Sequence, residues 1–193
     1  MNRPVLTIVA GSNGSGKSSL TSLSRTNFQQ IPILDPHAVA RSIQASLTGE
    51  NSDIEAGRQV LRHAEEFIAG LQSFTVETTL SGNTYLRMAA RAKGAGFVVV
   101  VFFVGTASVE INLERVRARV LKGGHDVPEE DQRRRFPRTL ANITRLLPLA
   151  DLVVIFDNST AKGHNLVGVG HPGFMHWVEP VPEWAEFLRG EAR

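Results

Sequence analysis

Gly11-Ser12-Asn13-Gly14-Ser15-Gly16-Lys17-Ser18 is the stretch of this sequence that decides the fold. Its spacing, G-x-x-x-x-G-K-S, is that of a phosphate-binding P-loop. The stretch follows an apolar, β-branched run at 5–10 and precedes a segment, 18–25, that can be helical. A P-loop joins a strand to a helix, so this context favours the motif over a glycine-rich turn that ends in Lys-Ser by chance.

The residue types in this loop suit the binding of phosphate groups. Glycines adopt backbone angles that side chains forbid, which lets successive N–H groups turn toward one anion. The positive end of the following helix dipole points at the same anion. We therefore expect residues 11–19, including Ser19, to bind the phosphates of ATP, with Lys17 on the β- and γ-phosphates and Ser18 on Mg²⁺.

The composition of the 193 residues predicts a single domain, 1–193, with a core of its own. The formal net charge of +2 is too small to argue for nucleic acid by itself. There is no cysteine, which excludes disulfides and thiolate chemistry and fits a reducing cytoplasm. The N-terminus lacks the apolar core of a signal peptide, and the longest apolar run, 97–104, is too short to span a bilayer. We expect a cytoplasmic protein that does not associate with membranes.

Apolar runs alternate with helix-like segments along the first 160 or so residues. Strands are predicted at 5–10, 31–34, 74–77, 97–104 and 151–156, and helices at 18–25, 38–47, 52–70, 84–95, 108–121 and 129–147. This alternation is typical of an α/β fold with right-handed crossovers, here a P-loop NTPase (kinase-like) fold with a five-stranded, mainly parallel sheet flanked by helices.

The alternation stops after about residue 160. A glycine-rich segment at 163–173 predicts a hairpin or loop, 175–178 a short strand, and 183–189 a final helix. We expect these to form a small C-terminal extension, about 160–193.

Ligands of such folds bind beyond the carboxyl ends of the strands, so residues there are the site candidates. Asp35 and His37 follow the second strand. One of them is expected to act as a general base, or Asp35 as a Mg²⁺ ligand with Ser18. The alternative is a helix cap at Asp35 and a solvated His37.

Three further candidates lie at strand ends. Glu77 ends a buried apolar strand, where an unpaired carboxylate is costly, so it needs a hydroxyl, an amide, a cation or Mg²⁺. Thr79 either binds substrate or satisfies a turn. Asp157 either belongs to the nucleotide site or forms a turn after the fifth strand.

A basic zone lies on both sides of Gly123-Gly124. Its members are Arg115, Arg117, Arg119, Lys122, His125 and Arg133 to Arg135. We interpret it as a lid, about 113–138, whose arginines stabilise the charge of a migrating phosphoryl group and whose closure expels water. Two solvated helix faces are the alternative. Binding of RNA or DNA is disfavoured, because no aromatic platform for stacking bases accompanies the zone.

Taken together, these segments resemble the zeta-toxin family of P-loop kinases, in particular its small bacterial members, often called predicted ABC-type ATPases. The resemblance extends to about residue 160. Its matching stretches are 11–19, 34–41, 56–58, 77–82, 115–128, 133–136 and 157–159. The P-loop alone is shared by many families, whereas the joint order is specific.

The resemblance implies a kinase that uses ATP and Mg²⁺. In the studied toxins the acceptor is the 3′-hydroxyl of a UDP-N-acetylated amino sugar, a precursor of peptidoglycan. By this resemblance Glu77 and Thr79 hold the acceptor, Arg115 acts at the transferred phosphate, and His125 or a nearby basic residue is a second such group. A small antitoxin protein that blocks the ATP site is the implied partner.

Two positions depart from the family pattern. The register puts His37 where the family has its catalytic aspartate, so His37 acts as the base, or Asp35 substitutes, or transfer is impaired. Arg58 lies in the region where the family has a further acidic residue, and we expect it near the substrate. We predict an ATP-dependent small-molecule kinase; the alternatives are a nucleotide-binding regulator or pseudokinase that transfers nothing, a plain ATPase, and an oligonucleotide kinase.

Overall fold

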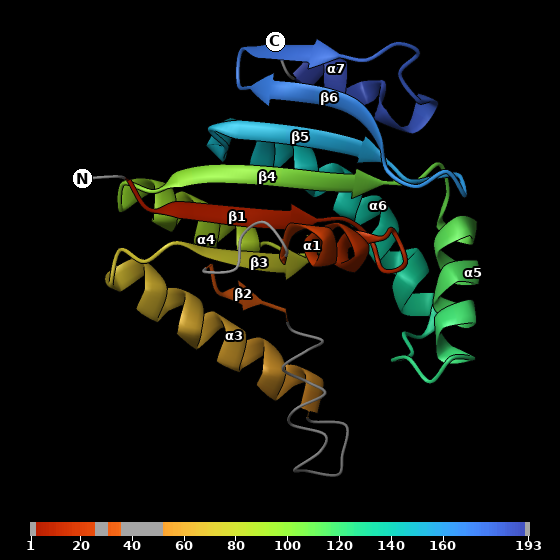
Figure 1. The fold of residues 1–193 in the computed structure, drawn as a ribbon, viewed down its shortest axis with the longest axis horizontal. Helices are drawn as coiled ribbons and strands as arrows, with labels where there is room; N and C mark the ends of the chain where they lie inside the picture. Colours follow the sequence, from red (N-terminus) through yellow and green to blue (C-terminus); the bar gives the residue numbers. More distant parts are fainter. Residues whose placement is uncertain (1–2, 26–30, 36–51, 192–193) are drawn as a thin grey trace.

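A computed structural model describes residues 3–25, 31–35 and 52–191 of the chain. The predicted helix at 38–47 and His37 lie outside these residues. The described residues form one seven-stranded sheet with the strand order β2-β3-β1-β4-β5-β6-β7 (Figure 1). The predicted α/β fold with a mainly parallel sheet is confirmed.

The first five strands of the sheet run parallel, and the last two are antiparallel. Their bounds are β1 Val5–Ala10, β2 Ile33–Leu34, β3 Phe74–Thr78, β4 Val98–Gly105, β5 Leu152–Asp157, β6 Asn165–His171 and β7 Phe174–Trp177. The predicted count of five strands is wrong, because β6 and β7 continue the sheet from β5. The C-terminal segment therefore enlarges the sheet.

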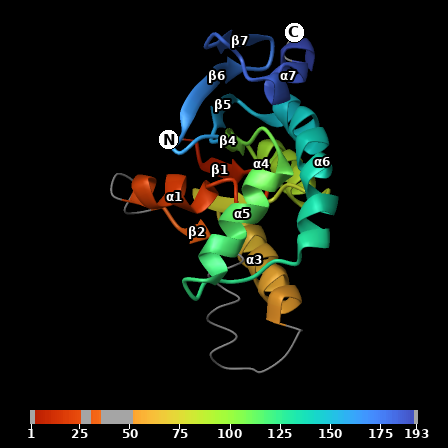
Figure 2. The ribbon, with the colours of Figure 1, turned by 90° about the vertical axis from the view of Figure 1, so that its right-hand side faces the viewer.

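Helices cover both faces of the sheet. They are α1 Lys17–Arg25, α3 Ser52–Ala69, α4 Thr84–Gly94, α5 Val109–Val120, α6 Glu129–Leu146 and α7 Phe187–Glu191, with short 3₁₀ turns at Leu147–Leu149 and Glu183–Ala185. Helices α4 and α6 lie on one face and α1 on the other (Figure 2). Helix α5 lies beyond the carboxyl ends of the central strands, beside α1 (Figure 1). This places α1 and α5 at the edge where the site is expected.

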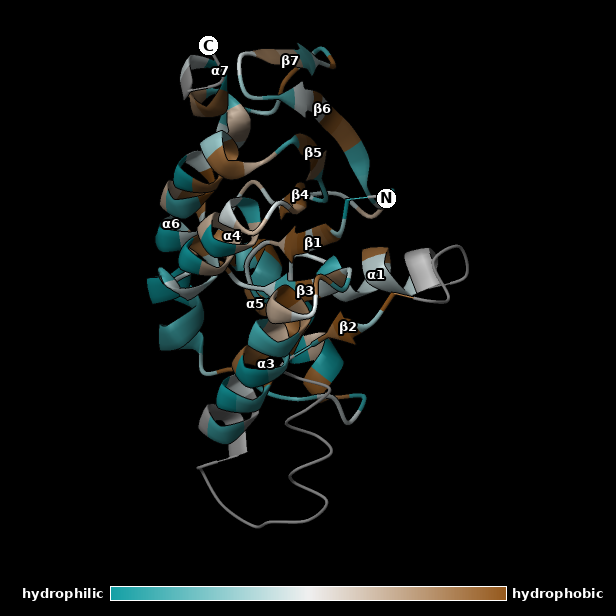
Figure 3. Cartoon of the chain, turned by 90° about the vertical axis from the view of Figure 1, so that its left-hand side faces the viewer, coloured by the Kyte–Doolittle hydropathy of each residue, from teal (hydrophilic) through white to brown (hydrophobic). Residues whose placement is uncertain are grey.

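The core lies around β1, which is hydrogen-bonded to β3 on one side and β4 on the other. Leu6, Ile8 and Ala10, which share one face of this strand, are fully buried, and Val9 on the other face is buried as well. Apolar residues line the strands, and hydrophilic residues mark the outer sides of α3 and α6 (Figure 3). The same apolar cluster extends to Trp184 and Leu188. No helix in the described residues is long and apolar enough to cross a membrane.

Candidate active site

The P-loop connects β1 to α1 and folds tightly against two neighbouring segments. Gly14 and Gly16 have φ values of +78° and +101°, in the region that favours glycine. A Cβ on Gly14 would lie 2.5 Å from the backbone oxygen of Asn112 in α5. A Cβ on Gly16 would lie 2.3 Å from Nδ2 of Asn158. Both positions therefore require glycine, for conformation and for space.

Several polar groups of the loop are left for a ligand. Helix α1 begins at Lys17, and the N–H groups of Ser19 and Leu20 donate to the backbone oxygen of Gly16. The N–H groups of Lys17 and Ser18 have no partner within the helix. Ser15 Oγ is fully buried and has no hydrogen-bond partner in the described part of the chain. Open N–H groups at a helix start and an unsatisfied hydroxyl suit a phosphate group, so the loop fits the predicted ligand.

Lys17 extends into the loop that it follows. Its Nζ donates a hydrogen bond to the backbone oxygen of Ser12 at 2.9 Å, and the residue is only 8% exposed. Burial lowers the pKa of Lys17 to about 8, against the opposing influence of Glu77 and Asp35, and Arg119 lowers it further. A nearby anion favours the charged form of a buried lysine, so the binding of phosphate raises the pKa of its amine.

Glu77 stands at the end of β3, next to β1, and turns its carboxylate toward α1. Ser18 Oγ donates to Glu77 Oε2 at 3.1 Å, and Thr21 Oγ1 donates to the other carboxylate oxygen. Glu77 is 5% exposed, so these hydroxyls satisfy a buried charge, as its place in the sequence required. Sequence reasoning missed Thr21, although its position three residues after Ser18 puts it on the same helix face.

A cavity of about 490 Å³ opens beside these residues, within the range of small-molecule sites. Eleven predicted site residues line it, three from the P-loop before Lys17 and eight between positions 17 and 119. Its lining is Asn13, Gly14, Gly16, Lys17, Ser18, Ser19, Asp35, Glu77, Thr78, Thr79, Tyr85, Arg115, Arg119, Arg135 and Asn158. The other three residues of the loop, Gly11, Ser12 and Ser15, are not part of this lining.

Asp35 and Tyr85 form one end of the cavity. Asp35 is buried at the end of β2, which neighbours β3 in the sheet. Burial raises the pKa of Tyr85 to about 12, and the charge of Asp35 raises it as well. The phenol therefore stays protonated as a hydrogen-bond donor. Sequence reasoning missed Tyr85, because a tyrosine among the apolar positions of a helix is also an ordinary core residue.

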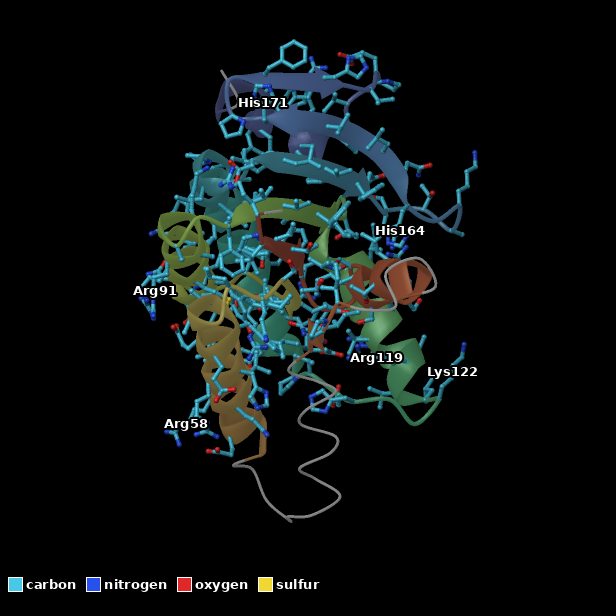
Figure 4. All side chains as sticks on the ribbon, turned by 60° about the vertical axis from the view of Figure 1, so that its left-hand side comes forward. Arg58, Arg91, Arg119, Lys122, His164 and His171 are labelled. Carbon is cyan, nitrogen blue, oxygen red and sulfur yellow. The ribbon has the colours of Figure 1, made fainter. Side chains whose placement is uncertain are left out.

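Three arginines also line the cavity. Arg115 and Arg119 come from α5, and Arg135 comes from α6. Figure 4 shows Arg119 between α5 and α1. Its Nη2 donates to the backbone oxygen of His125 at 2.7 Å, and Arg135 donates to Asp131 at 3.0 Å. Arg135 belongs to the predicted basic zone but was not singled out in the sequence.

Other members of the basic zone do not reach the cavity. Arg133 bridges Glu110 and Glu129, at 2.8 Å each, and Arg117 pairs with Glu129 at 2.6 Å. These exposed pairs join α5 to α6. Lys122 lies at the outer end of α5 (Figure 4). The zone is thus divided into a wall of the cavity and an external ion-pair network.

Three predicted site residues lie away from the cavity lining. The Arg58 side chain is 69% exposed on α3 and lies 3.7 Å from Glu55 (Figure 4). His125 contributes its backbone oxygen to Arg119. Asp157 accepts hydrogen bonds from Ser159 Oγ at 2.5 Å and from Trp184 Nε1 at 2.9 Å. The next residue, Asn158, takes the place in the lining that Asp157 was expected to take.

The oxygen atoms near the P-loop suit a Mg²⁺ ion that is also bound by nucleotide phosphates. The hydroxyl of Ser18 and the carboxylates of Glu77 and Asp35 are hard oxygen ligands, which this cation prefers. Among the described residues no group of three or more His, Cys, Asp or Glu side chains is placed to hold a metal ion by itself. Such a cation therefore needs ligands from phosphate and water, as is usual for Mg²⁺.

Comparison with known proteins shows to which family this chain belongs. The model of the zeta toxin family matches residues 1–165. This chain belongs to the zeta toxin family. The resemblance stated from the sequence is thereby confirmed. This member of the family is accordingly a P-loop kinase, a phosphotransferase with ATP as the donor.

Individual known proteins are similar to this chain. An uncharacterized protein of Haemophilus influenzae is 38% identical over 120 residues, which cover 62% of this chain and 84% of the relative. The structure of the PezAT chromosomal toxin-antitoxin system of Streptococcus pneumoniae contains a chain that is 15% identical, with a TM-score of 0.64 over 99% of this chain and 86% of that one. The structure of AvrRxo1-ORF1:-ORF2 with ATP gives 18% identity and a TM-score of 0.72, over 98% and 64%. At these identities the two structures show a shared fold.

Proposed function

We propose that this member of the zeta toxin family transfers the γ-phosphate of ATP to a hydroxyl group of a small molecule, a UDP-N-acetyl amino sugar or a similar acceptor. The observation that carries the proposal is the composition of the cavity. Its lining includes Lys17, Ser18 and Glu77 at the P-loop, together with Arg119 and Arg135. A nucleotide phosphate bound between them leaves its terminal group among positioned charges, which is most of what this chemistry requires.

The roles on the phosphate side follow from the contacts. The N–H groups at the start of α1 and the ammonium of Lys17 hold the β- and γ-phosphates. Ser18, supported by Glu77 and with Asp35 nearby, would hold Mg²⁺. When bound, this ion neutralises charge on the phosphates. Arg119 and Arg135 stabilise the charge that develops on the migrating phosphoryl group.

The acceptor is proposed to bind where Asp35, Thr79 and Tyr85 line the cavity. Asp35 orients the acceptor hydroxyl and takes its proton, with His37 as the competing candidate for that role. Tyr85 and Thr79 donate hydrogen bonds to polar groups of the acceptor. Glu77 is proposed to serve the metal side, because both of its carboxylate oxygens accept hydrogen bonds from α1.

The test is label transfer from ATP marked on its γ-phosphate to a panel of UDP-sugars and other hydroxyl compounds. Wild-type protein should label at least one acceptor, and Lys17→Ala should lose at least about a hundredfold in rate, because positioned electrostatics dominate this reaction. The rates of label transfer by Asp35→Asn and His37→Asp show which of the two residues acts as the base. Hydrolysis of ATP that no acceptor changes would instead support an ATPase, and label that appears only in His37→Asp would support a non-transferring regulator.

A small inhibitory protein is proposed as a partner. The PezAT structure is that of a toxin-antitoxin system, and the cavity here is lined by residues of α1 and α5, which an inhibitory protein would cover. We place the reaction in the cytoplasm, where ATP is supplied. Inhibition of label transfer by a small protein encoded beside this chain would test the partnership.

A further inference from the structure

The segment that follows β3 reaches the cavity in a strained backbone conformation. Thr79 lines the cavity, and its hydroxyl lies 3.1 Å from that of Ser81. In such a pair the accepting hydroxyl keeps its own proton for a ligand. The next residue, Leu80, has a φ of +55°, which a bulky side chain rarely adopts and which persists only where the surroundings impose it. The Leu80 side chain is fully buried, so the backbone that presents Thr79 is held by its neighbours.

Two side chains of α6 impose this conformation. The backbone oxygen of Thr79 accepts a hydrogen bond from Thr139 Oγ1 at 2.7 Å, and that of Leu80 accepts one from Asn142 Nδ2 at 2.9 Å. These oxygens belong to the peptide groups before and after the Cα of Leu80, so α6 fixes both backbone angles of that residue. Thr139 and Asn142 are buried. Loss of either donor would leave a buried carbonyl unsatisfied, which is costly.

Both donors are themselves oriented by contacts within α6. Thr139 Oγ1 also lies 3.0 Å from the backbone oxygen of Arg135, one helical turn before it, but its contact outside the helix is the shorter one. Asn142 Oδ1 accepts from Arg145 Nη1 at 2.9 Å. An arginine side chain only donates hydrogen bonds, so this contact turns the amide nitrogen of Asn142 toward Leu80.

The same face of α6 carries a residue of the phosphoryl side. Arg135, Thr139 and Asn142 follow one another at intervals of four and three residues, the spacing of one helix face. Arg135 lines the cavity and is the residue proposed above to stabilise the migrating phosphoryl group. One helix face thus contacts both the donor side of the site and the segment that carries Thr79.

We propose that Thr139 and Asn142 are positioning residues for the acceptor. They hold Leu80 in its strained conformation, which directs the Thr79 hydroxyl toward the acceptor and sets the distance between the acceptor and the phosphoryl group beside Arg135. The inference rests on the proposed function, since it takes a hydroxyl compound as the acceptor. Phosphoryl transfer requires close alignment of the reacting atoms, so a small displacement of the acceptor slows transfer while ATP binding is unaffected.

The division of ATP between acceptor and water tests the inference. Thr139→Val retains the shape of the side chain and removes the hydroxyl. With ATP labelled on its γ-phosphate, we compare transfer to UDP-N-acetylglucosamine and the rest of the acceptor panel with phosphate release in the absence of acceptor. Transfer should fall at least about tenfold, whereas phosphate release and ATP affinity should stay within about twofold of wild type. Asn142→Leu should behave in the same way.

The ratio of transfer to phosphate release does not depend on the fraction of molecules that are folded, so a loss of stability alone would leave it unchanged. Thr144→Val is the matched control on the same helix, because it removes a hydroxyl that donates to the backbone oxygen of Ala141 at 2.8 Å. It should transfer label like wild type. Thr139→Ser, which keeps a hydroxyl, should regain most of the transfer.

Amide hydrogen exchange follows the segment without any acceptor. Exchange at 78–83 should become faster in Thr139→Val and in Asn142→Leu, while exchange at 12–20 stays as in wild type. The P-loop is the sensitive comparison, because the N–H of Gly11 donates to the backbone oxygen of Thr78 at 3.2 Å.

Several results overturn the inference. Equal loss of transfer and of phosphate release would make Thr139 a support of the P-loop or of the whole fold. Unchanged exchange at 78–83 would mean that α6 does not hold the segment, and faster exchange with unchanged transfer would mean that the segment does not position the acceptor. Failure of the proposed function looks different, because wild-type protein would then label no compound of the panel, and the inference would fall with it.

Discussion

Lys17 combines a buried position with a charge that only a ligand can fully compensate. Its hydrogen bond goes to the backbone oxygen of Ser12, and the carboxylates of Glu77 and Asp35 offset part of the cost of burial. The result is a pKa of about 8 in the ligand-free protein. An arriving triphosphate stabilises the ammonium form, so binding of ATP and protonation of Lys17 favour each other.

This coupling predicts proton uptake on binding. At pH 8 about half of the ligand-free molecules hold Lys17 neutral, so ATP binding should take up roughly half a proton at that pH. Affinity for ATP should fall as the pH rises above 8, because more molecules must gain a proton. Isothermal titration calorimetry in buffers of different ionisation enthalpy measures the uptake. A binding enthalpy at pH 8 that does not depend on the buffer would contradict the prediction.

Glu77 provides the second test at the scale of one residue. Glu77→Gln retains the size of the side chain but removes the charge that faces Ser18 and Thr21. We expect ATP affinity in the presence of Mg²⁺ to fall by about tenfold, since a charged oxygen ligand is lost from the metal side. Affinity for ATP in chelator should stay the same or rise. Thr21→Val, which leaves the carboxylate in place, is the control.

The opposite pattern for Glu77→Gln would support the role implied by the family resemblance. In that case acceptor affinity would fall while the Mg²⁺ dependence of ATP binding stayed as in wild type.

Some of these residues were predictable from the sequence and others were not. Lys17 and Ser18 belong to a motif whose geometry is local. Glu77 ends an apolar strand, so the sequence predicts a buried carboxylate that needs a partner. Tyr85 gives no comparable signal, because its role depends on α4 lying beside the end of β2. Arg58 was expected near the substrate only because of its position in the family pattern, and in the structure its side chain is exposed on α3.

At the scale of elements, the P-loop depends on the segments packed around it. Gly16→Ala would place a Cβ 2.3 Å from Asn158 Nδ2, at a φ of +101° that alanine rarely adopts. We expect the variant to lose nucleotide binding and about 1 to 3 kcal/mol of stability. Gly94→Ala, at a helix end with no atom within 4 Å of the added Cβ, is the control. Urea unfolding measures both variants, and wild-type behaviour of Gly16→Ala would refute the described loop conformation.

Strands β6 and β7 show where sequence patterns are least informative. Gly168 pairs with Trp177 across the two strands, and a Cβ on Gly168 would lie 2.9 Å from the indole ring. Glycine in a strand leaves room for a large neighbour, but in the sequence it also indicates a loop. The segment 163–173 was predicted as a hairpin or loop for this reason. Most of this segment is the strand β6, which pairs with β5 on one side and with β7 on the other.

At the scale of the whole molecule, the C-terminal segment completes the core behind the site. Trp184 packs on Phe103 with ring centroids 6.1 Å apart, and its Nε1 donates to Asp157 at 2.9 Å. A Cβ on Gly105 would lie 2.1 Å from the indole. The family match ends at residue 165, so the tryptophan that covers the end of β4 comes from beyond the matched region.

Trp184→Ala should therefore destabilise the protein strongly. Removal of a buried tryptophan costs about 3 to 5 kcal/mol, and the carboxylate of Asp157 also loses a donor. Trp184→Phe should lose less, because it keeps most of the packing. Equilibrium unfolding in urea gives both values. A loss below about 1 kcal/mol for Trp184→Ala would mean that the segment after 165 is not part of the folding unit.

The proposed reaction moves the γ-phosphate of ATP to an acceptor hydroxyl in the cavity that Lys17 and Arg119 line. Phosphorus NMR of wild-type protein with ATP, Mg²⁺ and each member of the acceptor panel follows that phosphate directly. We expect a new phosphate-monoester signal on one acceptor, formed at the same rate as ADP and absent with Lys17→Ala. Formation of inorganic phosphate alone, at a rate that no acceptor changes, would contradict it.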